Sequence, residues 1–382
     1  MALTIAQQRA LAAMPKVVGS TSFFFSSLIV WTVVRDKRKR SKTYHRLVAG
    51  ISCIDISTSF WLALSTWPIP RESGVQWAVG TTETCELQGF FTQIGNAGPI
   101  YNTSLLLYYL LTIRYGWKDQ SIGRIEPFLH TIPLVWGIGT AVAGIPLQLF
   151  NNATFWCWIA PHPGRLEPHA ADIYRWAFFY VPLWLAIGSV TTTLLLIFLH
   201  VRRIERATEQ YQADFYTRNS FARTTSGENL EGRTHSSDSM GGFTVVSQRQ
   251  FRSSFSASSL SSGRTRRVAN QCLCYAGAFY FNWVCVSIVR LIQTFDGDAP
   301  YALLLLSVLT VPIQGLPNFL VYLGPTIWQD WKDRKPNQKP YRESGTLQQS
   351  SKQQEASKLA AAGNDDGTKR VIEKDLENLT AL

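Results

Sequence analysis

Seven long apolar stretches divide the chain and limit its fold more than any other feature. A mostly apolar segment of about 18 or more residues is long enough to cross the hydrocarbon core of a bilayer as a helix. The segments lie at 17–34, 47–67, 87–113, 128–150, 173–200, 268–293 and 300–323. We therefore expect an all-α membrane protein, a seven-transmembrane-helix bundle that forms one domain over residues 17–323.

The positive charge between these stretches lies almost wholly on alternate sides. Of the 37 Lys and Arg residues, 31 fall in the segments 35–46, 114–127, 201–267 and 324–382. Lys and Arg are retained in cytoplasmic loops, so residues 1–16 are expected outside the cell and the carboxyl terminus inside. The same asymmetry accounts for the net charge of +11, and we expect no nucleic acid partner.

Polar composition marks the regions outside the expected spans. Residues 207–264 are rich in Ser, Thr, Gly and Arg without an apolar period, which predicts a disordered cytoplasmic loop. Serines of this loop lie near basic residues, as in the substrates of basophilic kinases, so the loop is a candidate for regulation by phosphorylation. The alternative is a passive linker without a regulatory role. Residues 324–335 place Ile327, Trp328 and Trp331 on one face, as in an amphipathic helix on membrane lipid. Residues 336–382 are expected to be a disordered tail.

Two of the six cysteines lie outside the spans on the side expected to be oxidising. Cys85 precedes the third span, and Cys157 lies between the fourth and fifth. A disulfide bond between them would fix that loop across the mouth of the bundle. The alternative is two free thiols.

Polar residues inside a span are costly, and they therefore indicate function or a buried hydrogen bond. Asp55 is the one acid well inside a span, and it is interpreted as a polar hub linked to Asn318 or Tyr322. A purely structural acid is the alternative. Asn96 lies beside Gly95 and Pro99 in the third span, so we expect that helix to be irregular and buried.

Aromatic and basic residues gather near the expected outer face. The candidates for ligand binding are Trp156, Trp158, Arg175 and Arg290. They suit an anionic or amphipathic ligand. The alternatives are an aromatic belt at the membrane interface and an ion pair of Arg290 with Asp296 or Asp298.

Asn152 begins an Asn-Ala-Thr sequon in the second outer loop. The sequon predicts a glycosylation site. A glycosylated loop would lie on the extracellular side.

Missing motifs narrow the function classes. The last span has no lysine for a retinal Schiff base, and the six histidines form no metal-binding cluster within the spans. No nucleotide-binding loop or nucleophile elbow is present in the sequence. We therefore expect neither an enzyme nor a cofactor. A receptor is the leading hypothesis, with a transporter, a channel or a non-signalling scaffold as alternatives.

The last two spans read NQCLCYAGAFYFNWVCVSIVRLIQ and PIQGLPNFLVYLGP. They resemble the cyclic-AMP-receptor-like group of G-protein-coupled receptors of slime moulds and other protists. The resemblance implies that Trp283 is the conformational toggle residue of the sixth span. It implies that Asn318 and Tyr322 form a conformational switch on the inner side of the seventh span. It also implies that Cys85 and Cys157 form a shared outer disulfide bond.

The expected function is therefore that of a plasma-membrane receptor for an unidentified extracellular ligand. Helices five and six would open an inner cleft for a heterotrimeric G protein. The residues expected to line this cleft are Arg114, Tyr115, Arg202, Arg203, Arg266 and Arg267. For Arg114 and Tyr115 the alternative is contact with lipid phosphate.

Overall fold

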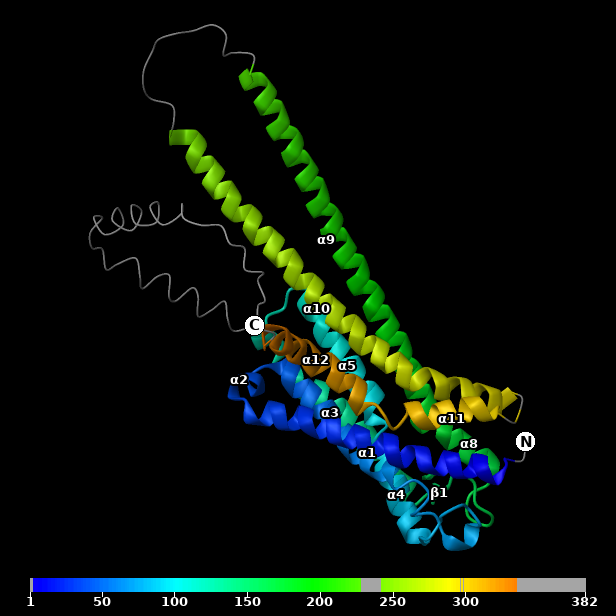
Figure 1. Cartoon of the computed structure of the whole chain (residues 1–382). Coiled ribbons are helices and arrows are strands. Elements are labelled where there is room, and N and C mark those ends of the chain that lie inside the picture. The colour runs from blue at the N-terminus through cyan, green and yellow to red at the C-terminus, as the bar shows by residue number, and fades with distance from the viewer. Residues whose placement is uncertain (1–2, 228–241, 296, 298, 335–382) are drawn as a thin grey trace, which may run out of the picture. The chain divides into compact units, whose positions relative to one another are not determined.

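The computed structural model describes residues 3–227, 242–295, 297 and 299–334, and most of these residues are helical (Figure 1). The α-helices are α1 (Ile5–Arg35), α2 (Lys37–Arg40), α3 (Thr43–Ala63), α4 (Thr82–Ile94), α5 (Ala97–Ile113), α6 (Asp119–Ile122), α7 (Glu126–Gly144), α8 (Pro168–Arg175), α9 (Val181–Gly227), α10 (Gly242–Phe295), α11 (Tyr301–Thr310) and α12 (Gly315–Arg334). A 3₁₀ turn, η1 (Arg71–Ser73), and a π-helical turn, η2 (Trp176–Tyr180), complete the helical elements. Residues 1–329 form one compact unit, and residues 330–382 form a second.

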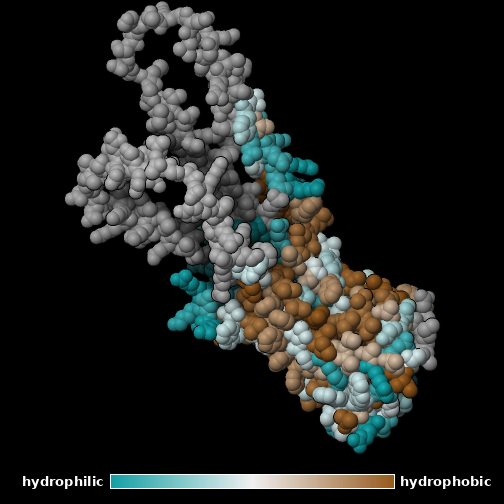
Figure 2. All heavy atoms as spheres, viewed as in Figure 1, coloured by the Kyte–Doolittle hydropathy of each residue, from teal (hydrophilic) through white to brown (hydrophobic). Residues whose placement is uncertain are grey.

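Several of the helices are long and apolar enough to cross a membrane. Four meet this criterion within the described residues: Ile5–Arg35, Thr43–Ala63, Pro168–Asp214 and Arg267–Phe295. A fifth is possible if α11 and α12 form one bent span. The molecular surface agrees with this, because apolar side chains cover much of the face between more hydrophilic ends (Figure 2). The chain is therefore consistent with a multi-pass membrane protein.

The core of the first unit lies between the helices and combines aliphatic with aromatic side chains. Leu47, Leu105 and Tyr275 are among its fully buried members. α1 packs closely along α3, where the hydroxyl of Ser59 donates to that of Ser22 over 2.8 Å. Small residues at such a crossing let two backbones approach, which favours helix association in an apolar environment.

Two of the expected spans are broken helices. The segment 87–113 divides into α4 and α5 at Gly95 and Asn96, which confirms the predicted irregularity. The segment 300–323 divides into α11 and α12, which are bent by 49° to one another. Pro312 lies in this break, where the missing N–H of a proline is tolerated.

The segment between α7 and α8 contains a departure from helix that we did not expect. β1 (Phe150–Asn152) pairs antiparallel with β2 (Cys157–Ile159) in a short hairpin. Cys157 of β2 forms a disulfide bond with Cys85 of α4, with 5.3 Å between their Cα atoms. This confirms the predicted pairing. We call this end of the unit the hairpin end and the opposite one, where α2 lies, the α2 end (Figure 1).

The helices extend beyond three of the expected span boundaries. α1 begins at Ile5, because Thr4 caps the helix through a reciprocal bond with Gln7, so helix replaces most of the expected 1–16 terminus. α9 continues to Gly227 and α10 begins at Gly242, where a disordered loop over 207–264 was expected. A formed helix extends at little cost, since nucleation has already been achieved. Residues 228–241 lie outside the described residues.

The amphipathic segment expected at 324–335 is not a separate helix. α12 runs from Gly315 through Pro325 to Arg334, so residues 324–334 continue the helix that precedes them. A proline is tolerated inside a helix when its backbone groups find other partners. The expected tail at 336–382 lies outside the described residues.

Candidate functional site

Three charged side chains meet at the hairpin end. Arg290 of α10 donates from Nη2 to Oδ1 of Asp172 on α8 over 2.8 Å, and Arg175 donates from Nη1 to the same oxygen over 3.1 Å. The Arg290 side chain is 6% exposed, whereas that of Asp172 is 51% exposed. The Nε atom of Arg290 is buried without a hydrogen-bond partner. Two guanidinium groups thus share one carboxylate, and the cluster keeps an excess positive charge.

The same cluster is tied to the β-hairpin. Arg175 donates from Nε to the backbone oxygen of Ile159 in β2 over 2.7 Å. β2 is in turn linked to α4 through Cys157, whose backbone N–H also donates to Gln88 over 2.8 Å. The hairpin, α4, α8 and α10 are therefore joined by covalent and polar contacts. The expected pairing of Arg290 with Asp296 or Asp298 lies outside the described residues, and Asp172 is the acid that it contacts.

Aromatic rings lead from the hairpin into the core. Trp158 donates from Nε1 to Gln93 over 2.8 Å, and its ring lies edge-on to Phe179 with 5.3 Å between centroids. Phe179 also contacts Trp283 of α10, with centroids 5.6 Å apart. Trp283 is buried, and its Nε1 has no hydrogen-bond partner. Trp156 lies in the hairpin turn, where its ring contacts Phe155.

The predicted polar hub lies between α3 and α12. Asn318 donates from Nδ2 to Oδ2 of Asp55 over 3.0 Å, and both residues are buried. Tyr322 is not part of this hub, because its hydroxyl lies 2.9 Å from Nδ1 of His45. Asn96 lies at the break between α4 and α5 with its Nδ2 buried and without a hydrogen-bond partner. Asp55 is thus joined to the first of its two predicted partners.

A group of tyrosines that the sequence did not reveal closes the α2 end. Tyr44 of α3 accepts a hydrogen bond from Nε2 of Gln271 over 2.7 Å, and its hydroxyl lies 3.1 Å from that of Tyr275. Three further rings surround it, those of Tyr108, Tyr109 and Tyr322. Gln271 and Tyr275 both belong to α10, so Tyr44 fastens α10 to α3. We call Tyr44, Gln271 and Tyr275 the tyrosine latch.

A partly buried ion pair lies beside the latch. Glu126, the first residue of α7, accepts hydrogen bonds from Nε and Nη2 of Arg46 and from the hydroxyl of Thr43. Burial raises the pKa of Glu126, but the hydrogen bonds and charge of Arg46 outweigh burial and hold the pKa below its ordinary value. Glu126 precedes the apolar stretch 128–150. Because Arg46 belongs to α3 and Glu126 to α7, this ion pair joins α3 to α7 at the α2 end.

Of the basic residues expected at the inner cleft, Arg114 lies at the carboxyl end of α5, and the others lie in the middle parts of α9 and α10. Arg114 and Arg203 line a common cavity of about 160 Å³ with His200. Arg114 lies over the ring of Tyr115, and Arg202 lies over that of Phe198. Arg267 is exposed on α10. Arg266 also belongs to α10, but the placement of its side chain lies outside the described features.

Asn152 ends β1 at the hairpin turn. Its Oδ1 accepts a hydrogen bond from the backbone N–H of Thr154 over 2.9 Å. This bond joins the two polar residues of the sequon. Glycosylation at Asn152 stays a prediction.

Sequence reasoning missed Asp172, Tyr44 and Gln271. Asp172 precedes Arg175 by three residues, a spacing that places both side chains on one face of a helix. This spacing was the signal from which an ion pair could have been predicted. The pairs Tyr44-His45 and Tyr108-Tyr109 were a visible concentration of aromatic residues near two span ends. Within the described residues, no group of three or more His, Cys, Asp or Glu side chains could hold a metal ion.

No family model matches the chain, and no curated protein matches it significantly. The fold and its contacts define a helical protein with several helices that could cross a membrane, stabilised by one disulfide bond.

Proposed function

We propose that the chain is a seven-span receptor of the plasma membrane that signals to a heterotrimeric G protein. The amino terminus and the hairpin end face the outside, as the distribution of Lys and Arg favours. The resemblance of α10 and α12 to cyclic-AMP-receptor-like proteins supports the same class. The ligand is extracellular and binds near Arg290, Arg175, Trp156 and Trp158.

The observation that carries this proposal is that α10 makes polar contacts near both ends of the helical bundle. Arg290 binds Asp172 at the hairpin end, and Gln271 and Tyr275 bind Tyr44 near the α2 end. Trp283 lies between them and contacts Phe179. One helix thus connects a charged cluster on one side with a hydrogen-bonded latch on the other, as signal transfer across a membrane requires.

A ligand acts in this scheme only through different affinities for two arrangements of the helices. An anionic or amphipathic ligand that contacts Arg290 competes with Asp172 for the guanidinium group. The resulting shift of α10 separates Gln271 and Tyr275 from Tyr44. The opened α2 end then offers one aromatic residue, Tyr115, and five basic residues to the G protein, namely Arg114, Arg202, Arg203, Arg266 and Arg267.

The remaining sites follow from this orientation. Asn152 carries an extracellular glycan on the hairpin, and Asp55 with Asn318 forms a polar switch in the core. Kinases act on the serines of 207–264, where added phosphate changes the charge presented to the G protein. Residues 324–335 contact membrane lipid.

The latch gives the sharpest test. Tyr44→Phe keeps the ring but removes both contacts of the hydroxyl group. In lipid nanodiscs without ligand, the purified variant should therefore stimulate nucleotide exchange in a panel of G proteins more strongly than the wild type does. The expected increase is up to roughly thirtyfold, since each of the two lost hydrogen bonds contributes about 1 kcal/mol. Tyr301→Phe removes a hydroxyl at the start of α11 and is the matched control.

Two further results decide between the function classes. Arg114→Ala should lower exchange, because it removes a cation from the proposed G-protein surface. If no G protein in the panel responds, and proteoliposomes instead show substrate flux that depends on Asp55, the transporter or channel alternative replaces the receptor.

A further inference from the structure

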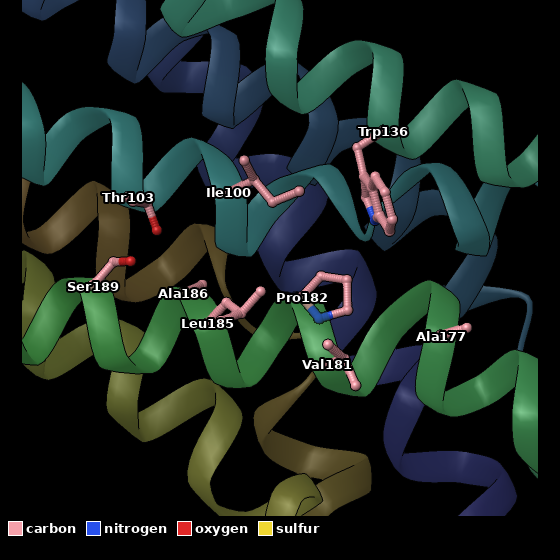
Figure 3. A pocket seen from close by; sticks show the side chains of 9 residues that line it. All are labelled: Ile100, Thr103, Trp136, Ala177, Val181, Pro182, Leu185, Ala186 and Ser189. Carbon is pink, nitrogen blue, oxygen red and sulfur yellow. The ribbon is translucent and has the colours of Figure 1, made fainter.

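A groove of about 340 Å³ lies between α5, α7 and the segment from η2 into α9. Figure 3 shows Ile100, Thr103 and Trp136 on one side of the groove and the residues of η2 and α9 on the other. The η2 and α9 residues are Ala177, Val181, Pro182, Leu185, Ala186 and Ser189. Their spacing follows a helical repeat, so they form one continuous stripe along the helix.

The groove opens onto the apolar surface of a helix that is long enough to cross a membrane. Leu185 is 68% exposed and Val181 is 49% exposed, and both lie within the candidate span Pro168–Asp214. In a bilayer these side chains face hydrocarbon. The molecules that reach this groove are therefore membrane lipids.

The chemistry of the lining agrees with an apolar occupant. The hydroxyl of Thr103 donates to the backbone oxygen of Pro99 in its own helix over 3.2 Å. The indole N–H of Trp136 donates to the backbone oxygen of Phe178 in η2 over 3.3 Å. No charged side chain lines the groove, so an ionic head group would be left without a partner.

The shape distinguishes between kinds of lipid. From Ala177 to Ser189 the stripe is about 18 Å long, comparable with one leaflet of the hydrocarbon core, about 15 Å. Ala177, Ala186 and Ser189 have short side chains, and Pro182 is a rigid ring, so this wall has little freedom to collapse into the groove. A rigid, flat body fills such a site without the rotamer entropy that a flexible acyl chain loses on binding.

We propose that this groove is a binding site for a membrane sterol. The sterol body lies along the η2 and α9 stripe and faces Ile100 and Trp136. The site is adjacent to the charged cluster, because η2 directly follows Arg175 and includes Phe179, which contacts Trp283. This site is independent of the proposed G-protein coupling and requires only that α9 crosses a bilayer.

The test uses the purified full-length chain in nanodiscs that contain a diazirine-labelled cholesterol, without any G protein. Labelled peptides are mapped by mass spectrometry, with and without excess unlabelled cholesterol. Ala177→Phe and Ser189→Phe fill the groove from exposed positions, and Leu195→Phe adds the same ring at an exposed position of α9 outside the groove.

We expect competable labelling of peptides from α5, α7 and α9. Each groove-filling variant should reduce this labelling about fivefold or more, because the added ring occupies the space that the sterol needs. Leu195→Phe should leave the labelling unchanged. Labelling that is equal in all variants, or that an acyl-labelled phosphatidylcholine reproduces with the same competition, would overturn the sterol assignment.

Discussion

The guanidinium group of Arg290 donates to the carboxylate of Asp172 over 2.8 Å, although the two residues are 118 positions apart. Arg175 contacts the same oxygen. The acid thus compensates two cations, one of which is almost fully buried. Removal of the acid therefore leaves a buried charge, which costs more than the loss of an exposed pair.

Asp172→Asn should lower the free energy of unfolding by about 1–2 kcal/mol, less than the cost of breaking a fully buried pair because the carboxylate is half exposed. Thermal unfolding in detergent measures the change. Glu86→Gln removes the acid of the exposed pair with Arg165 and should change stability by less than about 0.5 kcal/mol. Equal effects of the two substitutions would mean that burial of Arg290 adds nothing.

The disulfide bond should contribute strongly to stability at the hairpin end. Cys85 and Cys157 are separated by 72 residues, so the bond restricts a long loop in the unfolded chain. Cys85→Ser with Cys157→Ser should cost about 2–4 kcal/mol. Thermal unfolding of the double variant measures this loss. Cys274→Ser, at an exposed thiol of α10, is the control and should have little effect. A double variant as stable as the control would contradict the prediction.

Gly315 allows α12 to approach α1. Its N–H donates to the hydroxyl of Ser22 over 2.9 Å, and an added Cβ would lie 2.5 Å from the Ser22 carbonyl oxygen and collide with the Ser26 hydroxyl. Gly315→Ala should therefore destabilise the protein by about 1–3 kcal/mol.

Gly324→Ala is the matched substitution on the same helix. A Cβ at Gly324 meets no atom within 4 Å, so the better helix propensity of alanine should give a gain of up to about 1 kcal/mol. Opposite shifts of the two unfolding midpoints are the expected result. If both substitutions lower the unfolding midpoint, the contact between α12 and α1 is not the reason why alanine destabilises α12.

The pair of Glu126 and Arg46 should make stability depend on acid pH. The pKa of Glu126 is held below its ordinary value, because Arg46 outweighs the effect of burial. Its contribution is therefore complete above the ordinary pKa and is lost as the pH falls through the lower folded pKa.

Glu126→Gln should lower the unfolding midpoint at neutral pH and reduce the further loss between pH 7 and about pH 3. Unfolding midpoints across this range provide the measurement. Glu72→Gln, on the exposed turn η1, should leave the profile of the wild-type chain. A Glu126→Gln profile parallel to that of the wild type would show that the pair does not account for the pH dependence.

Many features of the fold followed from local properties of the sequence. Apolar stretches of membrane-crossing length predicted helices, and Gly95 with Pro99 predicted a break, because hydropathy and backbone restrictions act within one segment. The disulfide partners could be found because the other four cysteines lie within apolar stretches. The short hairpin was missed, since its two three-residue strands are too brief for a recognisable alternation.

The candidate site depended more on contacts between distant segments. Asp55 was recognised alone, as an acid in an apolar stretch, and Asn318 was one of two partners that the sequence allowed. The sequence by itself determined helical character, the disulfide bond and the asymmetry of charge, because these depend on composition and spacing along the chain. Only the tertiary structure decided that Arg290 meets Asp172 and that Tyr44 meets Gln271 and Tyr275, because such contacts depend on how helices pack and rotate against one another.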